Sequence, residues 1–199
     1  PAPESAPSPG PPPTDHLALA LYYQRVGNFD EALAQYRVML EANDLSAEVH
    51  NNLGLLYQDH GDAAEAVRQF ERAIAIAPRY AKAHNNLGVA LMKAGQLEPA
   101  AAEFRVALAA DARNVESLVN LALVQKSSGR GAEARDLLRR AVAIDPRHAG
   151  SRYNLAVVAD EAGDVGTAIE HYRAFLRLGA VTYGNLAAPV RARLAALGG

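Results

Sequence analysis

The chain has 199 residues, half of them hydrophobic, with a formal net charge of −2 and no cysteine. A nearly neutral chain has no bulk attraction to nucleic acid or to an anionic membrane, and a chain without cysteine has no disulfide, thiolate metal site or cysteine nucleophile. No stretch approaches the roughly 18 apolar residues that a membrane-spanning helix needs, so we expect no nucleic-acid partner and no direct membrane insertion.

Residues 1–13, PAPESAPSPGPPP, contain seven prolines and no large apolar side chain. Proline fixes φ and removes an amide donor, so we expect a proline-rich linker that is extended or disordered. A ligand for an SH3-type domain is the alternative. Because the chain does not begin with methionine, we also expect an upstream piece, such as a signal peptide, a lipid anchor, a membrane helix or another domain.

A period of 34 residues runs through the rest of the chain. Three columns repeat one residue type, a fourth is always small and a fifth is always bulky. These columns are Gly27, Gly61, Gly95, Gly129 and Gly163; Ala32, Ala66, Ala100, Ala134 and Ala168; Leu19, Leu53, Leu87, Leu121 and Leu155; Ala20, Gly54, Gly88, Ala122 and Ala156; and Tyr36, Phe70, Phe104, Leu138 and Tyr172.

Each unit is predicted to be a helix hairpin, because apolar residues follow helical spacing on both sides of the column glycine. The glycine suits the left-handed end of the first helix, and polar residues such as Asn28 and Asp62 suit the start of the second. Pro78 and Pro146 predict the ends of second helices, whereas Pro99 falls in a first turn, where it is tolerated. Small residues facing bulky ones allow close helix crossings, so stacked hairpins share a continuous core.

This pattern closely resembles the tetratricopeptide repeat, with histidine in place of the usual tryptophan. The resemblance implies an all-α fold, a right-handed α-solenoid of five helix hairpins. We place the repeats at 13–46, 47–80, 81–114, 115–148 and 149–182, with a capping helix in 183–199 in which an amphipathic stretch follows Pro189. The residues that carry the resemblance are His50, Leu53, Gly54, Tyr57, Gly61, Ala66, Phe70, Ala73 and Pro78.

The histidines are the residues whose spacing most resembles a series of metal ligands. His16, His50 and His84 recur at the repeat period, but they occupy the family's packing position for tryptophan, so we expect packing rather than metal binding or acid–base work. The other three, His60, His148 and His171, have no histidine or carboxylate at metal-ligand spacing. We therefore expect no metal.

Catalytic motifs are also missing from the sequence. There is no glycine-rich phosphate loop, no GxSxG and no nucleophile paired to a base. Asp160 and Glu161 are adjacent in a predicted helix and so point in different directions, which suits a solvated helix end better than a carboxylate pair. We expect no enzymatic activity and no cofactor.

The resemblance implies that the first helix of each hairpin lines a concave groove. The residue before the column leucine is asparagine in four repeats, and a carboxamide can both donate to and accept from one peptide unit. The alternative is that these amides bond to the neighbouring repeat and stiffen the stack. The ladder is similar to the one in the O-GlcNAc transferase superhelix, where asparagines engage the main chain of a bound segment. It consists of Asn52, Asn86, Asn120 and Asn154.

Other predicted groove residues mix amides, apolar side chains and lysines. The lysines lie near the middle of the groove, with Glu48 and Asp59 on one side and Asp160 and Glu161 on the other, so a ligand with a central acidic residue would fit. Simple solvation of these charges is the alternative. The carboxylate clamp of chaperone-binding members needs lysine at two asparagine positions here, so we expect no EEVD tail. These residues are Asn51, Asn85, Leu55, Val89, Leu123, Lys82, Lys93, Lys126 and Tyr153.

The sequence thus favours a protein-interaction module that binds an extended segment of a partner in its groove, as an adaptor or assembly factor. A self-assembling scaffold is one alternative, and the recognition arm of a larger enzyme, such as a glycosyltransferase, is another. Richness in alanine, arginine and leucine suggests a bacterial source, and the proline-rich start favours a periplasmic or lipid-anchored location over a cytoplasmic one.

Overall fold

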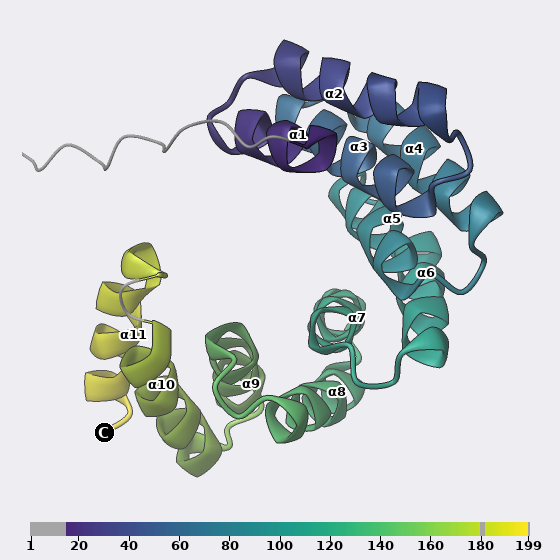
Figure 1. The fold of residues 1–199 in the computed structure, drawn as a ribbon. Helices are drawn as coiled ribbons and strands as arrows, with labels where there is room; N and C mark the ends of the chain where they lie inside the picture. The colour runs from purple at the N-terminus through teal and green to yellow at the C-terminus, as the bar shows by residue number, and fades with distance from the viewer. Residues whose placement is uncertain (1–14, 180–181, 199) are drawn as a thin grey trace, which may run out of the picture. The chain divides into compact units, whose positions relative to one another are not determined.

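The computed structural model describes residues 15–179 and 182–198, which form eleven α-helices and no strand (Figure 1). The linker predicted at 1–13 lies outside these described residues. The helices are α1 (His16–Arg25), α2 (Phe29–Ala42), α3 (Ala47–His60), α4 (Ala63–Ile76), α5 (Ala81–Lys93), α6 (Leu97–Ala110), α7 (Val115–Ser127), α8 (Gly131–Ile144), α9 (Ala149–Glu161), α10 (Val165–Gly179) and α11 (Gly184–Ala196).

The chain divides into two compact units, the first ending at Asn86 and the second beginning at Leu87, within α5. In the first unit, α1 packs on α2, α2 on α3, and α3 on α4. In the second unit, consecutive helices from α6 to α11 pack on one another, and α7 also contacts α9. The predicted all-α fold of helix hairpins is confirmed.

The five column glycines end the first helices, as predicted. Their φ angles lie between 75° and 99°, in the left-handed region where glycine avoids the clash that a Cβ would cause. The next residue immediately precedes the second helix and can cap it: the side chain of Asn28 accepts a hydrogen bond from the amide of Glu31, and that of Asp164 accepts one from the amide of Thr167. Asp62 differs, because its carboxylate contacts the His60 ring at 2.9 Å and makes no capping bond.

The bulky column forms the centre of each hairpin, since all five of its side chains are at most 5% exposed. Gly54 and Gly88 allow the closest crossings. A Cβ added to Gly54 would lie 2.5 Å from the Phe70 ring, and one added to Gly88 would lie 2.6 Å from the Phe104 ring. The predicted pairing of small and bulky columns is therefore a direct helix-to-helix contact.

The prolines follow the predicted register. Pro78 and Pro146 come just after α4 and α8, and Pro99 is the third residue of α6, where a proline takes no intrahelical bond away. Pro189 differs, because α11 begins at Gly184 and so contains it. Pro189 is exposed, so water can satisfy the carbonyl that loses its N–H partner, while Val190 and other apolar residues of α11 are buried. The amphipathic stretch predicted after Pro189 is thus the second half of a longer helix.

None of the helices in 15–179 and 182–198 combines the length and the apolar character that a membrane crossing requires.

Candidate functional site

In the first unit, the predicted groove residues of α3 and α5 form a connected set of amides. The Nδ2 of Asn86 donates to the Oδ1 of Asn51 at 2.8 Å, which joins two neighbouring repeats. The Nδ2 of Asn51 donates to Asn52, and that of Asn85 donates to Asn86, at 3.4 and 3.5 Å. Asn86 therefore does what the stiffening alternative expects, since its amide bonds to the helix next to it.

These hydrogen bonds leave some donors and acceptors of the asparagine side chains unused. Asn51 is only 3% exposed, whereas Asn52 and Asn86 are partly exposed. A carboxamide offers two N–H donors and an oxygen with two lone pairs, so both partly exposed side chains can bond to a further group. Structural and binding roles are compatible at these two positions.

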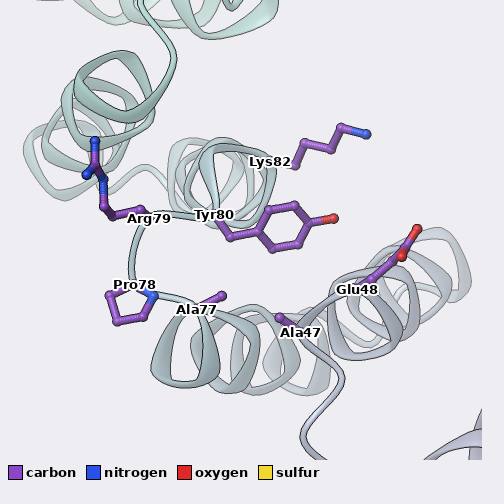
Figure 2. Close-up of a pocket in the computed structure, with 7 residues that line it drawn as sticks. All are labelled: Ala47, Glu48, Ala77, Pro78, Arg79, Tyr80 and Lys82. Atoms are coloured by element: carbon purple, nitrogen blue, oxygen red, sulfur yellow. The ribbon is translucent and has the colours of Figure 1, made fainter.

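An open pocket of about 760 Å³ lies one helical turn before these amides (Figure 2). Glu48 stands four residues before Asn52, and Lys82 stands four residues before Asn86. Figure 2 shows the Tyr80 hydroxyl directed toward the side where Lys82 and Glu48 lie, while the Arg79 side chain points away. The pocket is lined by Ala47, Glu48, Ala77, Pro78, Arg79, Tyr80 and Lys82.

The pocket presents charges of both signs around a largely apolar surface. Among the described residues, Glu48 and Lys82 take part in no hydrogen bond or ion pair. Burial, and to a lesser extent the Glu48 carboxylate, raises the pKa of Tyr80, so its hydroxyl stays protonated and can donate a hydrogen bond. The pocket can therefore receive a ligand in which an apolar group lies between an acidic and a basic group.

In the second unit, several predicted groove residues already have partners. The Lys126 ammonium lies 2.8 Å from the Glu161 carboxylate, and Asn154 donates to the carbonyl of Gly150 in its own helix at 2.9 Å. The Tyr153 ring packs against Phe175, with 5.2 Å between the ring centroids. The predicted positive centre is thus partly neutralised at Lys126, because the acidic residues expected beside it include its own ion-pair partner.

The other predicted groove residues vary in exposure but keep some accessible surface. Lys93 is exposed near the end of α5. Val89 and Leu123 are half-buried against hydrophobic clusters of the second unit, so each has one side in the core. Leu55, Asn85 and Asn120 are also half-buried.

A family model for the tetratricopeptide repeat matches residues 17–57, 51–115 and 119–181, which is more than half of the chain. The chain belongs to the tetratricopeptide repeat family. No curated protein matches it closely enough in sequence to count as a relative.

Several solved structures share the fold of this chain. The pilF protein of Pseudomonas aeruginosa is 22% identical with a TM-score of 0.76, over 92% of this chain and 90% of that one. PilW, described as a widely conserved type IV pilus biogenesis factor, is 21% identical with a TM-score of 0.74, over 91% of each chain. MamA of Desulfovibrio magneticus RS-1 is 20% identical with a TM-score of 0.69, over 84% of this chain and 95% of that one. These TM-scores establish a shared fold.

Two of the repeat-spaced histidines pack as expected for a tetratricopeptide repeat. His50 and His84 are 8% and 6% exposed, and the Nε2 of each lies 3.1 Å from a carbonyl oxygen of the preceding loop, that of Asp44 or Pro78. His16 is exposed instead, with its ring nitrogen 2.7 Å from the Gln35 side chain. In the part of the chain that the structure describes, no three histidine or acidic side chains gather as a metal site would require.

Asp160 is not the solvated residue that the sequence suggests. Its side chain is 11% exposed and accepts two hydrogen bonds of 2.7 Å from the Arg193 guanidinium on α11, with the Tyr172 hydroxyl 3.3 Å away. The hydrogen bond from Arg193 holds the pKa of Asp160 below its ordinary value, while burial raises the pKa of Tyr172 to about 12. This link fastens α11, which follows the last repeat, to α9, and no periodicity connects Arg193 to Asp160.

Proposed function

We propose that the chain is a non-catalytic interaction module that captures an extended segment of a partner protein on the exposed faces of its first helices. The observation that carries this proposal is the pocket of the first unit, where Glu48 and Lys82 make no hydrogen bond or ion pair with any described residue and stand beside a largely apolar surface. Unused charges of both signs, one turn from partly exposed amides, suit a peptide that brings side chains and main chain together.

The chemistry of the pocket refines the class of ligand. A segment with an acidic residue for Lys82, a basic residue for Glu48 and an apolar side chain between them would match all three features. The amides of Asn52 and Asn86 would then bond to the main chain that continues from the pocket. In the second unit, the exposed parts of Asn120 and Leu123 offer a similar surface, but with Lys126 already paired to Glu161.

The role in the cell would be that of an adaptor or assembly factor. This part of the proposal draws on fold similarity to PilW, described as a pilus biogenesis factor. The near-neutral charge favours a protein partner over nucleic acid. Because the sequence has no nucleophile–base motif, a link to catalysis would run through a larger enzyme that uses the repeats for recognition.

Self-assembly is the second candidate, supported by the exposed apolar residues of the first repeat. Leu21 and Val26 on and after α1 are 47% and 43% exposed, and Leu45 is 63% exposed. Analytical ultracentrifugation over a range of concentrations would detect it. If Leu21→Ser and Val26→Ser together abolish a concentration-dependent increase in mass, the scaffold alternative gains support.

The experiment for peptide capture begins with selection of a random-peptide display library against the purified chain. Binding of the selected peptides is then measured to the chain with its two pocket charges exchanged, Glu48→Lys with Lys82→Glu. The matched control exchanges two exposed charges on α4, Glu71→Lys with Arg72→Glu.

We expect the pocket exchange to weaken binding about tenfold or more and the control to leave it unchanged. Peptides that bind both variants equally well would contradict capture at this pocket. Peptides whose own acidic and basic residues are exchanged should recover affinity for the pocket variant, a result that general loss of structure cannot produce.

A further inference from the structure

The same notch between neighbouring repeats occurs in both units. In the first unit it lies between the start of α2 and the end of α3, and it is lined by residues that include Phe29, Leu56 and His60. In the second unit it lies between the start of α8 and the end of α9, and the corresponding residues, three repeat periods later, are Gly131, Val158 and Ala162. The repeat thus provides two versions of one site that can be compared position by position.

The α2–α3 notch is filled by the chain itself. The Phe29 ring stacks on the His60 ring, with centroids 3.8 Å apart and planes 22° from parallel. It also packs edge-to-face with the Tyr57 ring, with 5.7 Å between the centroids. The cavity that remains has a volume of about 110 Å³. An aromatic side chain is therefore what this geometry accommodates when the chain supplies one.

The α8–α9 notch contains neither of the two stacked rings of the α2–α3 notch. Glycine replaces Phe29 at position 131, and alanine replaces His60 at position 162. A Cβ built on Gly131 would have no neighbouring atom within 4 Å, and the cavity there has a volume of about 280 Å³. Its other lining residues include Ala132 and Val158, so the surface of the notch is largely apolar and is formed partly by small side chains.

The α8–α9 notch has also gained a cation. Arg135 lines it and takes the place of Leu33 in the first unit. The Nε of Arg135 is buried and has no hydrogen-bond partner among the described residues, a situation that natural structures generally avoid. Two carboxylates are near: Glu161 at the rim pairs with Lys126 at 2.8 Å, and Asp164 is held mainly by its hydrogen bonds with Thr167. The Asp164 carboxylate also interacts with the Arg135 charge, but the Nε–H of Arg135 has no hydrogen-bond acceptor in the part of the chain that the structure describes.

We propose that the α8–α9 notch binds an aromatic side chain presented by a partner protein, with its ring over Gly131 and against the Arg135 guanidinium. Phe29 shows, within the same chain, that a ring fits this place between two repeats. A guanidinium attracts the face of an aromatic ring, and its N–H groups can point into the π system. The site is separate from the pocket at Glu48 and Lys82, so either one can fail without the other.

The test is a titration of the ¹⁵N-labelled full chain with N-acetyl-phenylalaninamide, followed by amide chemical shifts. We expect saturable shifts concentrated at Gly131, Ala132 and Ala162, and none of comparable size with N-acetyl-alaninamide. Both probes are uncharged, so a response to the first alone reports the ring.

Three variants sharpen this titration. Gly131→Phe should fill the notch and abolish the shifts, whereas Gly131→Ala, its folding control, should retain them. Arg135→Leu restores the residue type found at Leu33 and should weaken binding about two- to fivefold through loss of the cation–π contact.

The proposal is overturned if the phenylalanine probe shifts no amide of the notch up to its solubility limit. It is also overturned if Gly131→Phe, folded by its spectrum, binds the probe as well as the wild type does. If Arg135→Leu binds the probe as tightly as the wild type does, the guanidinium does not contribute to binding, and the proposed contact between the ring and the cation is contradicted.

Discussion

The notch at α2–α3 and the notch at α8–α9 are built on the same repeat and differ in what fills them. The first holds two stacked rings, Phe29 and His60, and the second holds Gly131, Ala162 and the buried Nε of Arg135. Around both notches the core columns are the same: Ala32 and Ala134 are fully buried, and Tyr36 and Leu138 are at most 1% exposed.

This difference shows where a repeat protein is free to vary. Each hairpin must bury the same face against its neighbours, so a change in a core column weakens both the hairpin and its contacts with the adjacent repeats. The notch lies at the edge of that core, and emptying it removes only partly buried side chains. Repeat-specific binding sites are therefore expected at such edges, where one repeat departs from the others.

The largest effect is expected from breaking a column that both units share. Gly88→Leu would drive a side chain into the Phe104 ring, since even a Cβ there would lie 2.6 Å away. We expect a loss of about 3 kcal/mol or more in the free energy of unfolding, measured by urea denaturation. The control is Gly131→Ala, where open space and better helix propensity predict a gain of about 0.5 kcal/mol. Equal effects would contradict the packing described for the two glycines.

A smaller effect is expected from emptying the filled notch. Phe29→Ala removes the ring that stacks on His60 and should destabilise the chain by about 1–2 kcal/mol, less than for a fully buried ring. The same denaturation experiment measures it. If the loss is negligible, the ring does not hold the α2–α3 notch together.

Acid should destabilise the region around the α8–α9 notch more than the region around the α2–α3 notch. The reason is Asp160, which lies on α9 between Val158 and Ala162. Its counterpart on α3 is Gln58, which does not titrate. The folded-state pKa of Asp160 is lowered by the Arg193 hydrogen bond, so the stability it contributes is complete above its ordinary value of 3.8 and is lost as pH falls through the lower folded value.

We therefore expect amides of α9 and α11 to lose hydrogen-exchange protection in acid before those of α3 do. In Asp160→Asn that pH dependence should be much reduced, and the effect should be smaller than that of Phe29→Ala because the Arg193 side chain is about half exposed. If the acid transition is unchanged in Asp160→Asn, other carboxylates cause that transition.

The smallest effect is expected from Arg135→Leu, which gives the open notch the residue found in the filled one. Removing a buried donor without a partner should offset the lost side-chain contacts, so the change in unfolding free energy should stay below about 1 kcal/mol. A thermal melt checks this. A large loss would indicate that Arg135 has a structural partner that the folded chain depends on.

The repeat architecture could be predicted from the sequence because its determinants are local and periodic. Gly61 and Gly95 predict the left-handed turns, and Gly54 opposite Phe70 predicts the close crossing. Periodicity places a residue on a helix face, but it does not say which neighbour that residue bonds to.

The candidate site was therefore predictable only in outline. That Asn86 bonds to Asn51, and Lys126 to Glu161, depends on side-chain reach between helices. Arg193 lies in a helix outside the repeat, so no column connects it to Asp160. The α8–α9 notch could have been suspected from Arg135, since Leu33 and Ile169 are apolar at the same position, but its volume needed the structure.

The most direct test of the comparison is the difference in melting temperature between Gly131→Phe and Gly131→Ala. If the α8–α9 notch is an unfilled version of the α2–α3 notch, Gly131→Phe should melt at the higher temperature, because its ring becomes partly buried, as Phe29 is in the first unit. If Gly131→Phe melts at or below the temperature of Gly131→Ala, the two notches are not equivalent, and the proposed site for an aromatic side chain is contradicted.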